Sequence, residues 1–552
     1  MLEALKEQKA LETLKKAAVI SATHDAGHEF QRPGCHEGTR VAVLERLMHW
    51  LVGNFEPEAV FLWLYGDAGA GKSSIGQSFA VKCAQERRLL ASFFFWRNEP
   101  QRSSHIILVA TLIYQVVTIV PALRTLVAAV IDRDPFILGK HLRVQIISLL
   151  VEPINELIST PDFDPSSIPT LILVDGLDEC STKINQVSIL MSFAQALPQC
   201  RHPLKILIAS RPEVEIMATF NCSSLICLST RIALSASFDS DDDIEKFLVD
   251  TFDTIRSGHP ISAYIPASWP KRGVIRKLVE RTSGQFIFAS TIGKYISDPD
   301  QKPVEQLDII MALRPAPINA NMPYTELNAL YTYVLSCVPT NKIETALDIL
   351  TFIMVVRPIL GTLFPSERSL PTVRSHHRAL LFLLSLEPGD PSFYLANLSS
   401  VLKIHGGGYH PNIQISHASL RDFLLDPRRS QRFYCNPQRI FTRMLGICLE
   451  CLTTDGLFRI KIIQATWLTS FLILSAPCKL AVSYDSGESL CRLWVLVWLL
   501  ERVELTPKLQ SQLMKISLPK LWDSHRQPCG NREDYHFLSH ALALLVLVEQ
   551  KV

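Results

Sequence analysis

The chain has 552 residues, of which 48% are hydrophobic and 20% are charged, and its formal net charge is +2. This composition excludes a disordered chain, allows a large core divided among about three or four domains, and gives no electrostatic reason to expect a nucleic-acid partner. The 13 cysteines are scattered without zinc spacing, which is typical of reduced thiols in a cytoplasmic protein. The longest apolar stretches, 460–476 and 493–500, predict core helices, because the first is interrupted by polar residues and the second is too short to span a membrane.

The N-terminal stretch, residues 1 to 20, has leucines at helical spacing and predicts an amphipathic helix. This helix would either pack on the next domain or form the tail of an adaptor or signalling segment. A polar linker is expected over 24–37, followed by a second helix over 41–52 that leads into a strand.

A phosphate-binding loop follows that strand. Residues 61–65 (FLWLY) predict a buried strand, 66–73 (GDAGAGKS) fit G-x-x-x-x-G-K-[ST] at every fixed position, and apolar residues at helical spacing come next. The glycines leave backbone N–H groups open to an anion, while the lysine can contact the β- and γ-phosphates and the serine can contact Mg²⁺. The candidate nucleotide-binding residues are Gly66, Asp67, Ala68, Gly69, Ala70, Gly71, Lys72, Ser73 and Ser74, with Ser73 also a candidate metal ligand. The alternative is a glycine-rich turn without a ligand.

An acidic turn comes later in the chain, after a second expected strand over 90–96. Residues 171–174 predict a strand that ends in Asp175, Asp178 and Glu179. An aspartate at a strand end can hold Mg²⁺, so Asp175 is the second candidate metal ligand. Asp178 or Glu179 would orient or deprotonate an attacking water, and the spacing does not separate them. The alternative is a solvated acidic turn.

Two further strands complete the expected sheet, over 205–209 and 225–228. Arg211 follows the first of them and could reach a γ-phosphate, although a surface ion pair is the alternative. The acidic run 239–243 is interpreted as the cap of a helix, because carboxylates favour a helix N-terminus.

Helical patterns then take over, through 277–296, 324–338 and 343–356, with a further helix over 419–425. Residues 401–404 and 413–417 predict a β-hairpin across a glycine turn, as in the wing of a winged helix. His417 ends this hairpin. Two roles are open for its side chain: a contact to a nucleotide, or a hydrogen bond to the local backbone. No repeat of 20–50 residues is visible in the mostly helical stretches that follow.

In these motifs the chain resembles the NACHT class of STAND-type P-loop ATPases, in particular the fungal NLR-like proteins and the N-terminal module of nephrocystin-type proteins. The matching stretches are GDAGAGKSS, LILVDGLDEC, ILIASRPEVEI, TSGQFIFASTIGKYI and ISHASLRDFLLD, with CHEGTRVAVLERLMHWL before them, and they cover residues 35 to 435. The chain departs from the family at Gly284-Gln285-Phe286, which lacks the proline that packs on adenine in many relatives, and it shows neither an effector domain nor a repeat array.

The resemblance implies an α/β P-loop NTPase core with a parallel five-stranded sheet, in which the 206–209 strand separates the 61–65 and 171–174 strands. Helical and winged-helix domains and an α-helical C-terminal region would follow. The expected boundaries are 1–34 for the N-terminal helix and linker, 35–235 for the NTPase domain, 236–325 for the helical domain, 326–436 for the winged helix and 437–552 for the C-terminal region. In related proteins a winged-helix histidine contacts ADP, and His417 matches it.

The resemblance further implies a switch that binds ATP or ADP with Mg²⁺, hydrolyses ATP slowly and closes on ADP, with protein partners or self-association on activation. A role in fungal innate immunity or self/non-self recognition would go with it. The alternatives are a nucleotide-binding scaffold without useful hydrolysis and an AAA-type motor. The motor is disfavoured because no pore-loop signature is visible, and guanine is disfavoured because no N-K-x-D motif follows the acidic strand.

Overall fold

The structure is a computed structural model. It describes residues 2–27, 32–97, 99–234, 240–282, 284–313, 325–359, 377, 379–381, 383–405, 412–415, 417–453, 507, 509 and 511. The chain forms two compact units, of which the first comprises 1–334, 399–402 and 415–422, and the second comprises 335–398, 403–414 and 423–552. Each unit is described by itself below.

The first unit is built on a five-stranded sheet. Its strands are β1 (Phe61–Tyr65), β2 (Leu89–Phe94), β3 (Leu171–Asp175), β4 (Lys205–Ser210) and β5 (Ser229–Ala233), in the order β2-β3-β4-β1-β5. All neighbours pair in parallel, with Leu62 opposite Leu207 and Leu173 also opposite Leu207. The strand that carries Arg211 at its end therefore lies between the phosphate-loop strand and the acidic strand, as expected of a P-loop NTPase.

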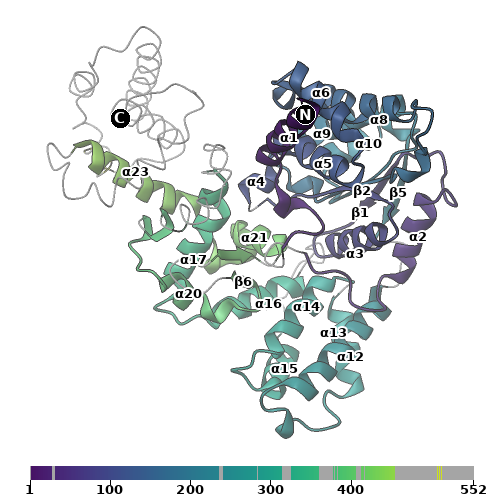
Figure 1. The fold of residues 1–552 in the computed structure, drawn as a ribbon. Helices are drawn as coiled ribbons and strands as arrows, with labels where there is room; N and C mark the ends of the chain where they lie inside the picture. The colour runs from purple at the N-terminus through teal and green to yellow at the C-terminus, as the bar shows by residue number, and fades with distance from the viewer. Residues whose placement is uncertain are drawn as a thin grey trace. The chain divides into compact units, whose positions relative to one another are not determined.

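Both faces of this sheet are covered by helices (Figure 1). Successive side chains of a strand point to opposite faces, so β1 contributes Phe61 and Trp63 to one apolar cluster and Leu62 and Leu64 to the other. A continuous apolar strand fits this double burial. One cluster contains the phosphate-loop helix α3 (Lys72–Gln85) and α2 (Val41–Leu51).

The other cluster packs the opposite face of the sheet against α1 (Leu2–Ala17), α5 (Ile106–Ile119), α6 (Leu123–Arg133), α7 (Leu142–Ile146), α8 (Glu152–Leu157), α9 (Lys183–Ala196), α10 (Val214–Phe220) and α11 (Ser223–Ile226). The short helix α4 (Pro100–Ser103) follows β2. The N-terminal helix thus packs against α5 and α6 on this side of the sheet, and its Leu14 is 1% exposed. Residues 32–40, which connect it to α2, form neither helix nor strand.

The fifth strand was predicted at the wrong place. Residues 225–228 do not form a strand: they end α11, and β5 begins at Ser229. Leu225 is buried as a core side chain of that helix, whereas in β5 Ile232 is buried and the other four residues are partly exposed. An apolar tetrad without a clear period suits either structure, and here tertiary packing selects the helical turn.

A group of helices completes the first unit. These are α12 (Ser240–Gly258), α13 (Arg272–Thr282), α14 (Phe286–Ile296), α15 (Pro303–Ala312) and α16 (Thr325–Ser336). The predicted helical stretch 277–296 is broken at Gly284, whose φ of +74° lies in the left-handed region that favours glycine. Asp241, Asp242 and Asp243 lie in the first turn of α12, in line with their interpretation as helix-terminal acids.

The second unit contains α17 (Ile343–Thr351), α20 (Asp390–Leu395), α22 (Pro427–Ser430) and α23 (Pro437–Thr453). The predicted hairpin forms a two-stranded sheet of β6 (Leu402–His405) and β7 (Asn412–Ile415). The helix α21 (Ala418–Leu424) follows it and belongs to the first unit as far as Asp422. The glycine turn at 406–408 and the apolar stretches 460–476 and 493–500 lie outside the described residues. Within the described part of the chain, no helix is both long enough and apolar enough to cross a membrane.

Candidate nucleotide site

The loop between β1 and α3 has the conformation that its glycines were expected to permit. Gly69 and Gly71 have φ values of +85° and +90°, and Gly71 is the N-cap residue of α3. A Cβ atom on Gly69 would overlap the side chain of Ile287 in α14, so this position needs glycine for space as well as for φ. Lys72 begins the helix, and Ser73 and Ser74 follow in its first turn.

Lys72 folds back over the loop. Its ammonium donates to the carbonyl oxygens of Gly66 at 2.5 Å and Asp67 at 2.7 Å. Burial lowers the pKa of Lys72 to about 8, against the opposing effect of Asp178 and with a further lowering by Arg211. The ammonium therefore lies within the loop, hydrogen-bonded to carbonyl oxygens, where an anionic ligand would interact with it strongly.

The acidic turn lies at the end of the neighbouring strand. Asp175 is 0% exposed and Asp178 2% exposed, and Gly176 between them has a φ of +71°. Neither oxygen of Asp175 accepts a hydrogen bond of good geometry from a described residue. Burial raises the pKa of Asp175, while Arg32 and then Ser73 act in the opposite direction.

Asp178 and Glu179, which the sequence does not distinguish, have different partners. Asp178 accepts from the backbone N–H of Arg211 at 3.0 Å, and its other oxygen lies 3.3 Å from Arg211 Nε. Glu179 accepts from the backbone N–H of Arg97 at 3.0 Å. Asp178 is thus tied to the end of β4, and Glu179 to the segment after β2.

Arg211 also contacts the helix that follows the hairpin. Its Nη1 donates to Asp422 Oδ2 in α21 at 2.5 Å. Two carboxylates, Asp422 and Asp178, raise the pKa of Arg211 against the effect of burial, so the guanidinium is charged. Arg211 does form ion pairs, as its alternative expected, and its side chain is 22% exposed and shared between two acids.

His417, just before α21, is part of a polar chain. Its Nδ1 lies 3.3 Å from Ser419 Oγ, which lies 2.8 Å from the hydroxyl of Tyr331 in α16. Burial lowers the pKa of His417 to about 3, with smaller lowering effects from Arg211, Arg32, Lys294 and Lys72. The imidazole is therefore neutral near pH 7 and close enough to the cations of the loop to sense their charge.

Two arginines of the site were missed from the sequence. Arg40 is 4% exposed and donates to Ala70 O of the loop at 3.0 Å, while its guanidinium lies 4.6 Å from the centre of the Phe286 ring. Arg32 donates to Ser73 Oγ at 2.8 Å. Arg40 falls inside the stretch that carries the family resemblance, so its motif was a usable signal, whereas nothing around Arg32 singled it out.

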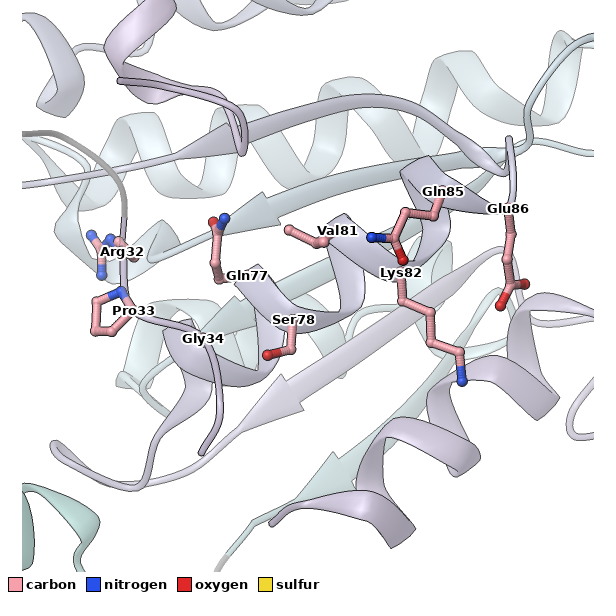
Figure 2. A pocket seen from close by; sticks show the side chains of 9 residues that line it. All are labelled: Arg32, Pro33, Gly34, Gln77, Ser78, Val81, Lys82, Gln85 and Glu86. Carbon is pink, nitrogen blue, oxygen red and sulfur yellow. The ribbon is translucent and has the colours of Figure 1, made fainter. Parts of the chain in front are cut away.

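A pocket of about 660 Å³ lies beside α3. It is lined by the linker residues Arg32, Pro33 and Gly34 and by Gln77, Ser78, Val81, Lys82, Gln85 and Glu86. Figure 2 shows Arg32 and Pro33 at one end of this pocket and Glu86 at the other. Arg32 thus belongs both to the pocket and to the phosphate-loop cluster.

Comparison with known families agrees with this geometry. Residues 39–211 match the family model described as "Nephrocystin 3, N-terminal", a match that includes the phosphate loop and the acidic turn and ends at Arg211. Over these residues the chain is similar to the nephrocystin-type P-loop NTPase region. The strand order and the position of the Lys72 loop at the end of β1 belong to the same fold.

Curated proteins and solved structures give the remaining comparisons. No curated protein matches the chain. Among solved structures, it is similar to Cdc6p from Pyrobaculum aerophilum, with 11% identity, 72% of this chain and 94% of that chain covered, and a TM-score of 0.32. It is also similar to Drosophila ORC bound to DNA, with 12% identity, 69% and 92% covered, and a TM-score of 0.25.

Proposed function

We propose that the chain is an ATP- and ADP-binding signalling NTPase that uses slow, Mg²⁺-dependent hydrolysis to control an open–closed transition. The observation that carries this proposal is the position of Arg211, which contacts the acidic turn through Asp178 and α21 through Asp422. An arginine at the end of the middle strand is placed to meet a γ-phosphate, and the same guanidinium holds a distant helix. A γ-phosphate at the loop would therefore compete with Asp422.

The residues present fit a magnesium nucleotide. The buried carboxylate of Asp175 and the hydroxyl of Ser73 both contact the guanidinium of Arg32. Their oxygens therefore face the same place, where a metal ion could contact both. Mg²⁺ in such sites takes one or two protein oxygens and completes its shell with phosphates and water. No cluster of three metal-ligating side chains occurs in the described ranges, which suits an ion held mainly by the nucleotide. When bound, Mg²⁺ would supply neutralisation of phosphate charge.

The chain's own groups have assignable roles in this proposal. Lys72 and the loop N–H groups of residues 66–74 bind and orient the phosphates, and Arg40 steadies the loop through Ala70. Glu179 is the proposed base that orients an attacking water, because Asp178 is already committed to Arg211. His417 would donate a hydrogen bond to the β-phosphate of ADP and would crowd a γ-phosphate, which favours the ADP form.

A second candidate is a nucleotide-binding scaffold without useful hydrolysis. It is favoured by the hydrogen bonds that both candidate bases accept, Asp178 from Arg211 and Glu179 from Arg97, because an oxygen occupied in this way is less available to orient an attacking water. Measured turnover separates the two candidates. Protein partners, self-association on activation and a role in fungal immunity or self/non-self recognition remain proposals from the family resemblance.

The experiment that tests the proposal is titration of the purified chain with a fluorescent ATP analogue. The parent should bind, and Lys72→Ala should weaken binding by more than about tenfold, because one charged partner of the phosphates is lost. Equal affinity of parent and variant would remove the nucleotide site from the phosphate loop. ADP retained through purification would favour the switch, and rapid turnover would favour a motor.

A further inference from the structure

Arg32, in the linker between α1 and α2, reaches the centre of the candidate site. Its Nη1 donates to Ser73 Oγ at 2.8 Å and lies 3.5 Å from Asp175 Oδ2, while its Nη2 lies 3.8 Å from Glu179 Oε2 and donates to Phe95 O at 2.5 Å. One guanidinium therefore contacts a hydroxyl, a carbonyl and two carboxylates that come from three separate elements.

Two of these oxygens, on Ser73 and Asp175, are those that the proposed function assigns to Mg²⁺. We propose that Arg32 is an internal counter-cation that competes with Mg²⁺ for them, so that loading of a magnesium nucleotide displaces Arg32 and releases the linker segment 32–35. This inference rests on the proposed function, since it describes how the same site is regulated.

The charge of Asp175 explains why a cation belongs at this point. The carboxylate is 0% exposed and accepts no hydrogen bond of good geometry from a described residue. An isolated buried charge is costly, and an opposite charge a few ångströms away offsets part of that cost. Arg32 supplies this charge, yet at 3.5 Å from Asp175 it makes an ion pair without a hydrogen bond to it. A divalent ion would satisfy the carboxylate better.

The two cations exclude each other. Both would contact Ser73 and Asp175, and like charges this close repel strongly in a site with little water. The side chain of Arg32 is 18% exposed and belongs to a segment without helix or strand, so it has a path to solvent that the buried acids lack. Displacement would therefore move the linker and leave β3 in place.

Besides Arg32, Cys35 attaches this segment to α3. The N–H of Cys35 donates to Ser78 Oγ at 2.8 Å, and Gly34 lies so close that a Cβ there would be 2.9 Å from the same oxygen. Arg32, Pro33 and Gly34 also form one end of the pocket in Figure 2. Loss of the Arg32 contacts would leave the segment held by Cys35 alone, through Ser78 and through packing against the apolar cluster of α2 and α3. This weaker attachment should make the part-buried thiol of Cys35 more accessible.

The first experiment measures cation binding without nucleotide, by electron paramagnetic resonance of Mn²⁺ added to the parent, Arg32→Gln and Arg46→Gln. Arg32→Gln should bind Mn²⁺ about fivefold more tightly than the parent, the size expected for removing one competing ion pair. Arg46→Gln is the matched control, because it removes the same charge from an exposed position of α2, away from the site. This variant should bind Mn²⁺ as tightly as the parent does.

Equal or weaker Mn²⁺ binding by Arg32→Gln would overturn the inference, and weaker binding would mean that Arg32 positions the oxygens of Ser73 and Asp175 instead of competing for them. The result is independent of ATP binding. A parent that binds no ATP analogue would contradict the proposed function, whereas a parent that binds the analogue with an unchanged Mn²⁺ affinity in Arg32→Gln would contradict only the role of Arg32.

The second experiment uses the parent chain, so it does not depend on how the variant folds. The rate of thiol alkylation at Cys35 is followed by peptide mass spectrometry with a non-hydrolysable ATP analogue, in the presence of Mg²⁺ or of a chelator. Alkylation of Cys35 should be several-fold faster with Mg²⁺, while the buried Cys83 in α3 serves as the internal control. An equal rate at Cys35 in both conditions would show that the linker stays attached and would overturn the release.

Discussion

Arg211 and Asp422 form an ion pair of 2.5 Å between the end of β4 and the middle of α21, although 211 positions separate them in the chain. The same guanidinium lies 3.3 Å from Asp178 in the acidic turn. A side chain shared in this way can report a change at the phosphate loop to a helix outside the sheet, because any new anion near Arg211 competes with Asp422.

Asp422→Asn should therefore weaken the closed form and accelerate the release of ADP. The pair is about one quarter exposed, so the expected change is about fivefold in the rate of release. Stopped-flow displacement of a fluorescent ADP analogue measures it. Asp308→Asn, a change at an exposed position of α15, is the control. A release rate equal to that of the parent would mean that the ion pair has no part in closure.

The pH dependence of nucleotide binding should follow Lys72. Its pKa of about 8 means that the ammonium is lost as the pH rises from 7.5 to 9, so ATP should bind about tenfold more weakly one unit above the pKa. Calorimetry at pH 8.5 in two buffers of different ionisation enthalpy should detect proton uptake on binding. The absence of proton uptake would show that Lys72 is already fully charged there.

Lys72 should also make the stability of the folded chain depend on pH, and here the effect of rising pH is favourable, whereas it weakens nucleotide binding. Its folded-state pKa lies below the ordinary value of 10.5, so between about pH 8 and 10.5 the unfolded chain binds more protons than the folded one. This group therefore raises the free energy of unfolding as the pH increases through that window. Lys72→Met should remove this contribution, and denaturant titrations at pH 7.5 and 10 would measure the difference.

The acidic turn should separate metal binding from hydrolysis. Asp175→Asn removes the buried carboxylate that faces Ser73. The gain in ATP affinity on adding Mg²⁺ should therefore be about tenfold smaller in this variant than in the parent. Glu179→Gln keeps the size of the side chain and its bond to Arg97, so binding should persist while turnover falls by about a hundredfold or more. Binding isotherms and single-turnover assays test the pair, and parent-like hydrolysis by both variants would refute these roles.

His417→Ala should speed the release of ADP and favour an open or self-associated form with ATP. The imidazole is neutral, and one hydrogen bond to a phosphate is worth about 1.5–3 kcal/mol, which corresponds to about ten- to a hundredfold in the preference for ADP. Release kinetics and sedimentation velocity are the measurements, with His49→Ala on the exposed side of α2 as the control. If neither quantity changes, His417 serves only its local bond to Ser419.

Much of the sheet was predictable because its signals are local. The run 61–65 and the glycines at 69 and 71 prescribe a buried strand and a left-handed turn before a helix, and both are found there. The apolar runs before Asp175 and Arg211 likewise predict strands that end at one edge. The failure at 225–228 came from a short apolar run without a period, where packing of Leu225 decided for a helical turn.

The position of β4 between its neighbours was expected only through the family resemblance, and the partners within the site were decided by the tertiary structure alone. Spacing leaves Asp178 and Glu179 equivalent, and the fold distinguishes them by placing Arg211 beside one and Arg97 beside the other. Arg32 carries no motif, and its contacts with Ser73 and Asp175 join residues 41 and 143 positions away in the chain. Such contacts depend on distances between residues far apart in the chain, which local propensity and periodicity do not contain, whereas strands and turns depend on neighbours that the sequence lists in order.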